Sequence, residues 1–201
     1  FMIQKNKITL FYTTLILMAF YAILPASASI PTKMKDNSLP KIFPEALMYL
    51  DDFFSHHILI AEKSTHQLHL FKNKGSYPEH IKTYQMATGK KAGDKLFQGD
   101  HKTPEGIYNL GPVYYRKDRI SRIDTQLKIL KIEKTMGWCD DVNNKNYNKI
   151  IRIDKKIRHE KLFRKSRIYD ILIPINYNTK NIKKNKGSAI FIHLTKNIKK
   201  P

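Results

Sequence analysis

Residues 187–193 read GSAIFIH, a short apolar run that ends on a histidine. Strand alternation would place Ile190 and Ile192 on one face, and Phe191 and His193 on the other. A histidine on an apolar strand is most often satisfied by a backbone carbonyl or by water, and less often it serves as a catalytic base. The run therefore predicts a strand and leaves the role of its histidine open.

Further β-branched and apolar runs occur along the chain, separated by polar or glycine-bearing turns. Two segments have helical character, one with apolar residues at helical spacing behind Pro44 and one near His159. The pattern predicts a mainly β sandwich or barrel with one or two short helices. The expected strands are 58–61, 68–71 (a hairpin with the first), 81–87, 107–110, 150–153, 168–175 and 189–194, and the expected helices are 44–54 and 159–163.

The chain has 201 residues and 41% hydrophobic residues, which suffices for one ordinary domain core. Its 37 Lys and Arg against 17 Asp and Glu give a net charge of +20, which favours contact with anionic polymers. Lys, Ile and Asn recur throughout, so the charge is also explained by a general compositional bias. No RNA-binding motif is present, and a specific nucleic-acid partner is therefore not expected.

The N-terminal region has the pattern of an export signal. Two lysines precede the uncharged run 8–24, and Pro25-Ala26-Ser27-Ala28 offers a small-residue cleavage site. A transmembrane anchor is the alternative, although the run is shorter than the ~20 residues that a bilayer core requires. We expect residues 1–28 to be a signal peptide and residues 29–56 a linker with a short helix. Residues 57–201 then form the domain, exported to the periplasm or cell envelope.

Metal and cofactor chemistry have little support in the sequence. Cys139 is the single cysteine, and the eight histidines show no spacing typical of a metal site. We therefore expect neither a metal nor a cofactor.

Several motifs occur in a fixed order: TGKKAGDKLFQGDHKTPEGIY at 88–108, GWCDD at 137–141, YNK at 147–149, YDILI at 169–173 and GSAIFIH at 187–193. Together they resemble the YkuD-type L,D-transpeptidase family, over residues 58–201. The resemblance implies an L,D-transpeptidase-like β domain.

The resemblance also implies site residues. The family uses a cysteine nucleophile in a (Ser/Thr)-x-Gly-Cys motif shortly after a histidine base, and the base matches His193. Because Pro201 stands where a proline commonly precedes that motif, we expect the sequence to be truncated before the nucleophile, with C-terminal strands missing. Cys139 does not fit the motif, and its neighbouring aspartates would raise its pKa.

Other motif residues have a structural or a substrate-binding interpretation. Gly187 and Ser188 could admit a substrate backbone and donate a hydrogen bond, or they could simply form the turn before the strand. For Trp138, Asp140, Asp141, Tyr147 and Asn148 we favour a role in holding loops through side-chain to backbone bonds.

The function implied by the resemblance is peptidoglycan L,D-transpeptidation. An acyl group of a tetrapeptide stem would pass through a cysteine acyl-enzyme to an amine acceptor, in cell-wall biogenesis. Peptidoglycan stem peptides are the expected partners, with peripheral contact to an anionic envelope. The alternative is a catalytically inactive, basic protein that binds the wall or another polyanion. The pattern fixes neither the acyl acceptor nor the oligomeric state.

Overall fold

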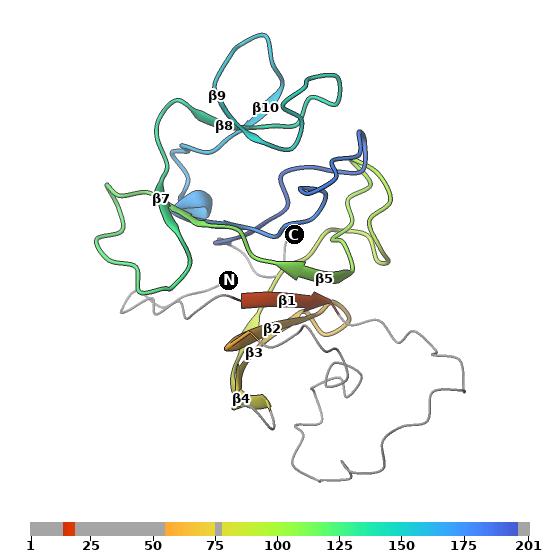
Figure 1. Ribbon diagram of the computed structural model, residues 1–201, viewed down its shortest axis with the longest axis vertical. Helices are drawn as coiled ribbons and strands as arrows, with labels where there is room; N and C mark the ends of the chain where they lie inside the picture. Colours follow the sequence, from red (N-terminus) through yellow and green to blue (C-terminus); the bar gives the residue numbers. More distant parts are fainter. Residues whose placement is uncertain (1–13, 19–54, 75–77, 197–201) are drawn as a thin grey trace.

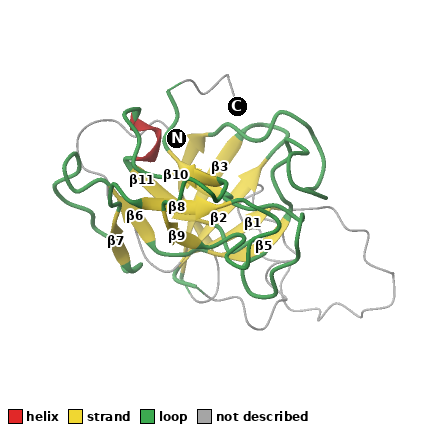
Figure 2. Ribbon diagram, turned by 90° about the horizontal axis from the view of Figure 1, so that it is seen from above, coloured by secondary structure: helices red, strands yellow, loops and turns green. Residues whose placement is uncertain are grey.

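A computed structural model describes residues 14–18, 55–74 and 78–196 (Figure 1). These residues form twelve strands in three open sheets and one short 3-10 helix, η2 (Arg167–Tyr169). The expectation of a mainly β protein is confirmed, and the unclosed sheets are consistent with a sandwich rather than a barrel. Figure 2 shows the strands crossing at the centre of the molecule, with loops around them.

The first sheet has five strands in the order β4-β3-β2-β1-β5. The predicted hairpin is confirmed, because β2 pairs antiparallel with β3 and the turn between them contains His66 at a φ of 55°. β1 lies between β2, to which it is parallel, and β5, to which it is antiparallel. β1 belongs to the segment for which the sequence predicts a signal peptide. The bounds are β1 (Thr14–Met18), β2 (His57–Glu62), β3 (Gln67–Asn73), β4 (Pro78–Gln85) and β5 (Gly106–Asn109).

The remaining strands form a four-stranded sheet, β12-β11-β6-β7, and a three-stranded sheet, β10-β8-β9. In Figure 1 the three-stranded sheet lies at the end of the molecule opposite β4. The bounds are β6 (Val113–Tyr115), β7 (Ile129–Lys131), β8 (Met136–Cys139), β9 (Ile150–Arg152), β10 (His159–Lys161), β11 (Ile171–Pro174) and β12 (Phe191–His193).

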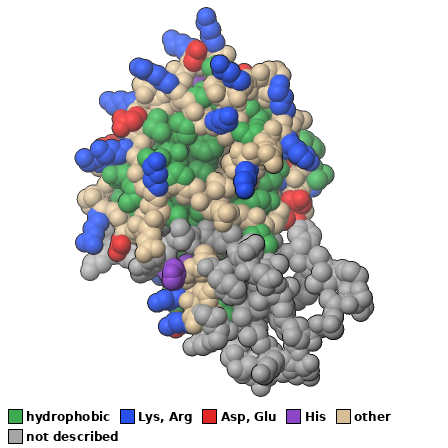
Figure 3. Space-filling view, viewed as in Figure 1, with side chains coloured by type: hydrophobic (Ala, Val, Ile, Leu, Met, Phe, Trp, Pro, Cys, Tyr) green, Lys and Arg blue, Asp and Glu red, His purple; other side chains and the backbone are tan. Residues whose placement is uncertain are grey.

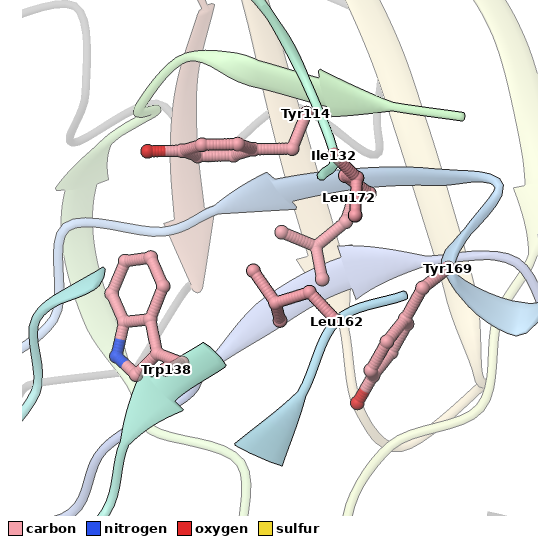
Figure 4. Packing of buried hydrophobic residues seen from close by; sticks show 6 residues of the cluster. All are labelled: Tyr114, Ile132, Trp138, Leu162, Tyr169 and Leu172. Carbon is pink, nitrogen blue, oxygen red and sulfur yellow. The ribbon is translucent and has the colours of Figure 1, made fainter. Parts of the chain in front are cut away.

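The core extends between the sheets because β11 is apolar on both faces. All four of its residues are buried. Leu172 packs into a cluster with Leu162, and Figure 4 shows Trp138 and Tyr169 on opposite sides of Leu162. Just after β11, Ile175 packs against Ala61, Leu68 and Met86 of the first sheet and its neighbouring loop. Burial on both faces is what a strand sandwiched between two layers requires.

One predicted helix is wrong, and the other lies outside the described residues. Residues 159–163 were expected to be helical, but His159–Lys161 form β10 and pair antiparallel with β8. Leu162 is fully buried beside that strand, so the ladder and the core contact outweigh the local helix propensity. The predicted helix at 44–54 and the linker before it are not described by the structure.

Candidate functional site

His193 lies at the end of β12, which pairs antiparallel with β11, with His193 opposite Leu172. The predicted alternation is confirmed, because Phe191 packs into the cluster of Leu172, whereas Ile192 packs against the other clusters. The backbone N–H of Leu194 donates to the carbonyl of Ile168, 3.0 Å away. The strand is therefore fixed on both sides of the histidine.

His193 is exposed to solvent but packs against the ring of Tyr169, and the position of its ring hydrogen follows from one contact. Nδ1 lies 2.8 Å from the carbonyl oxygen of Leu194. A carbonyl can only accept, so Nδ1 carries the hydrogen and the neutral ring keeps its lone pair on Nε2. Packing around the ring lowers the pKa of His193, whereas the bond to Leu194 opposes this change. At neutral pH the ring is thus a neutral base with a free Nε2 lone pair.

Gly187 and Ser188 lie in the segment that leads into β12. Gly187 is buried at a φ of 120°, and a Cβ there would come within 2.3 Å of Lys95 Cε. Its N–H donates to the hydroxyl of Tyr147, and the hydroxyl of Ser188 donates to Gln98 at 3.4 Å. These contacts give Gly187 a packing role. The prediction that both residues bind substrate stays a prediction.

Asn148 is the centre of the polar contacts that hold this segment. Its Oδ1 accepts the indole N–H of Trp138 at 2.8 Å and the backbone N–H of Ala189 at 3.1 Å. Its Nδ2 donates to the carbonyls of Tyr177 and Asn178. Asn148 itself is 4% exposed. The predicted loop-holding role through side-chain to backbone bonds is therefore confirmed for Asn148, whereas Trp138 bonds to a side chain. We call these contacts the Asn148 network.

A second set of contacts ties the same segment to the loop after residue 94. The hydroxyl of Tyr147, which accepts from Gly187, donates to Gln98 Oε1, and Gln98 Nε2 donates to the carbonyl of Asp140. The N–H of Gln98 donates to the carbonyl of Asn185. Together with the bond from Ser188 to Gln98, these contacts link segments that are up to 90 positions apart in the sequence.

The loop itself is braced by a buried ion pair between Lys95 and Asp100, 2.7 Å apart. Burial alone would raise the pKa of Asp100. The bond from Lys95 and the backbone N–H groups of Leu96, Lys102 and Phe97 outweigh that effect and hold the pKa well below its usual range. Asp100 therefore stays ionised and keeps the loop in one shape.

Cys139 is fully buried on β8. Burial raises the pKa of its thiol, and the negative charges of Asp141 and Asp140 raise it further. A hydrogen bond from the backbone of Asp141 and the positive charge of Arg158 lower the pKa, but by less. A reactive cysteine requires an accessible thiolate of lowered pKa. The expectation that the two aspartates raise this pKa is confirmed, although burial is the larger cause.

Three residues beside His193 were missed at the sequence level. The ring of Tyr169 lies edge-on to the imidazole, with 5.3 Å between ring centroids. Glu160 and Arg164 act on the histidine electrostatically. Their approach depends on the pairing of β11 with β12 and of β8 with β10, for which the sequence carries no local signal.

Within residues 55–74 and 78–196, no group of three or more His, Cys, Asp or Glu side chains could hold a metal ion. The described residues likewise include no helix that is long and apolar enough to cross a membrane.

Comparison with known families identifies the domain. Residues 56–200 match the family model of the YkuD domain, described as the L,D-transpeptidase catalytic domain. Neither a curated protein nor a solved structure matches the chain. The family match covers well over half of the 201 residues and contains every motif quoted above, from TGKKAGD to GSAIFIH. The chain belongs to the YkuD family of L,D-transpeptidase catalytic domains.

Proposed function

We propose that this protein is a peptidoglycan L,D-transpeptidase in which His193 is the general base. One observation carries the proposal: His193 is exposed at the end of a fixed strand, with Nδ1 engaged by a carbonyl and with Nε2 unbonded among the described residues, so that it can accept a proton. The lowered pKa keeps the ring neutral at neutral pH, as a base requires.

The chemistry that this histidine would support is acyl transfer through a thioester. Nε2 takes the proton of a cysteine thiol, and the thiolate attacks the carbonyl of an L,D-peptide bond in a tetrapeptide stem. The terminal D-residue leaves as the amine, accepting the proton from the imidazolium. An amine of a second stem then attacks the thioester, loses a proton to His193 and releases the thiol.

The nucleophile of this scheme is the cysteine that the family pattern places after His193. Cys139 does not meet the requirement because it is fully buried and the pKa of its thiol is raised. The direct test is to read the coding sequence that follows the codon for Pro201. An in-frame (Ser/Thr)-x-Gly-Cys motif is the expected result, and a stop codon in its place would contradict the enzymatic proposal.

We also propose export to the periplasm or cell envelope, supported by the basic, apolar and small-residue pattern of residues 1–28. Thr14–Met18 within this segment pair with β2 and β5, so cleavage would remove a strand from the first sheet. Mass spectrometry of the N-terminus of the cell-associated protein tests this. Cleavage after Ala28 is expected, and an intact N-terminus on a cytoplasmic protein would contradict it.

A second candidate is a basic protein that binds the wall without catalysis, which the net charge of +20 favours. Figure 3 shows Lys and Arg side chains spread around one face of the molecule, with fewer Asp and Glu. Cosedimentation with purified peptidoglycan at rising salt tests it. Binding that weakens steeply with salt supports this candidate, whereas absent or salt-insensitive binding contradicts it.

A further inference from the structure

Tyr169 is held beside His193 by groups that the proposed mechanism does not use. Its hydroxyl donates to Glu160 Oε1 at 3.1 Å, and the Nη2 group of Arg164 donates to the same oxygen. The guanidinium of Arg164 also lies over the Tyr169 ring, 5.1 Å from its centroid. The tyrosine is thus fixed at its hydroxyl and on its face, and it presents its ring to the imidazole at an interplanar angle of 80°.

The segment that carries Arg164 and Tyr169 is itself clamped from the other side. Arg116, which is 3% exposed, donates through Nη1 to the carbonyl of Arg164 at 2.7 Å. Arg119 forms an ion pair with the buried Asp170 at 2.7 Å. Charge-assisted bonds of this kind fix a loop more firmly than neutral ones. Tyr169 therefore faces His193 from a pre-organised segment.

Tyr169 also belongs to the core and is not a loose surface contact. Figure 4 shows it at the margin of the cluster that contains Leu162 and Leu172. Burial is the largest of the causes that raise the pKa of the Tyr169 hydroxyl. The hydroxyl therefore stays neutral and donates its hydrogen bond to Glu160. The ring excludes water from one side of His193, while the hydroxyl keeps a carboxylate close by.

We propose that Tyr169 is a positioning residue for His193, and that Glu160 and Arg164 hold Tyr169 against the imidazole. The inference rests on the proposed function for the role of His193 as base. It adds the group that keeps the imidazole in one orientation, in which Nδ1 stays on the Leu194 carbonyl. Packed side chains and hydrogen bonds around a catalytic group supply this kind of support.

The groups that face His193 act on its protonation in opposite directions. Packing, to which the Tyr169 ring contributes, lowers the pKa of His193, and the Leu194 carbonyl raises it. Glu160, on β10, raises it, and Arg164, in the loop after β10, lowers it. Removing the ring and removing the Glu160 charge must therefore shift the pKa of His193 in opposite directions. A role in folding alone would produce no such pair of shifts.

The test is an NMR titration of the His193 imidazole in the full chain, with H193Q used to assign its signal among the eight histidines. Y169L is expected to raise the pKa of His193 and to mix its two neutral tautomers. E160Q keeps an oxygen that can accept the hydrogen bond of Tyr169 but removes the negative charge of Glu160. It is expected to lower the pKa of His193. Y114L is the matched control, because Tyr114 is a buried tyrosine of the same cluster that makes no ring contact with His193 within the described residues.

The inference is overturned if Y169L and E160Q titrate as the wild type, or if Y114L shifts the pKa of His193 as much as Y169L does. Should Y169L fail to fold, Y169F decides instead, because it keeps the ring and loses only the bond to Glu160. Mixed neutral tautomers of His193 in Y169F support the inference, and a titration identical to that of the wild type overturns it. The titration needs neither substrate nor nucleophile. Its failure is therefore distinguishable from failure of the proposed transpeptidase function, which is read from cell-wall products.

Discussion

Replacing Asn148 with alanine removes all four hydrogen bonds of the Asn148 network in one step. The indole N–H of Trp138 and the backbone N–H of Ala189 lose their acceptor, and Trp138 is only 7% exposed. An unsatisfied buried donor costs roughly 1–3 kcal/mol. Ala189 is half-buried, so water recovers part of its loss. The lost bonds should therefore lower the free energy of unfolding by about 2–4 kcal/mol.

A second cost of N148A comes from the backbone, because residue 148 has a φ of 57°. Alanine in the left-handed region is strained by roughly 1–2 kcal/mol. Asn185 provides a matched control, since its φ is 62° and its side chain makes no hydrogen bond within the part of the chain that the structure describes. N185A should lower the free energy of unfolding only by the strain of alanine in the left-handed region.

The assay is urea unfolding followed by far-UV circular dichroism and by the fluorescence of Trp138, the single tryptophan. N148A is expected to be less stable than N185A by about 2–4 kcal/mol, a large share of the 5–15 kcal/mol typical of a domain. Equal losses in the two variants, within ~0.5 kcal/mol, would refute the argument that the network anchors the segment before β12.

Three further outcomes follow from the buried groups. G187A places a Cβ within 2.3 Å of Lys95 Cε and should lower the free energy of unfolding by about 1–3 kcal/mol, and an unchanged melting temperature would contradict this. The pKa of Asp100 is lowered on folding from its ordinary value of 3.8. The stability that Asp100 contributes to the folded protein is therefore fully present above pH 3.8 and is lost as the pH falls below that value. D100N should cost about 3–5 kcal/mol at pH 7 and flatten the loss of stability below pH 3.8, whereas an identical acid profile would argue against the ion pair. Cys139 should react with a thiol reagent only after unfolding, so rapid labelling of the folded protein at pH 7 would reopen its candidacy as nucleophile.

The strands that could be predicted from the sequence are those that consist of a local run of apolar, β-branched residues bounded by polar residues. The run 58–61 is apolar and β-branched, and a polar segment separates it from 68–71, so both strands and their hairpin were predicted. Residues 159–161 carry no such pattern. They form β10 because Cys139, Trp138 and Gly137 of β8 supply a ladder, and that partner is distant in the sequence.

Some residues of the candidate site could likewise be identified from the sequence, whereas others could not. His193 was identifiable because the strand pattern and the family motif both include it. Tyr169, Glu160 and Arg164 were not, because they reach His193 only through the pairing of β11 with β12 and the placement of β10. Asn148 was correctly expected to hold loops, although its four partners became clear only in three dimensions.

If His193 is the base of a peptidoglycan L,D-transpeptidase, its loss must abolish L,D cross-links in the cell wall. These cross-linked muropeptides are measured by liquid chromatography and mass spectrometry in a strain deleted for the gene and complemented with the wild-type locus or with H193A. We expect the wild-type locus to restore the cross-links and H193A, at equal protein abundance, to leave them absent. Equal restoration by both, or restoration by neither, would contradict it.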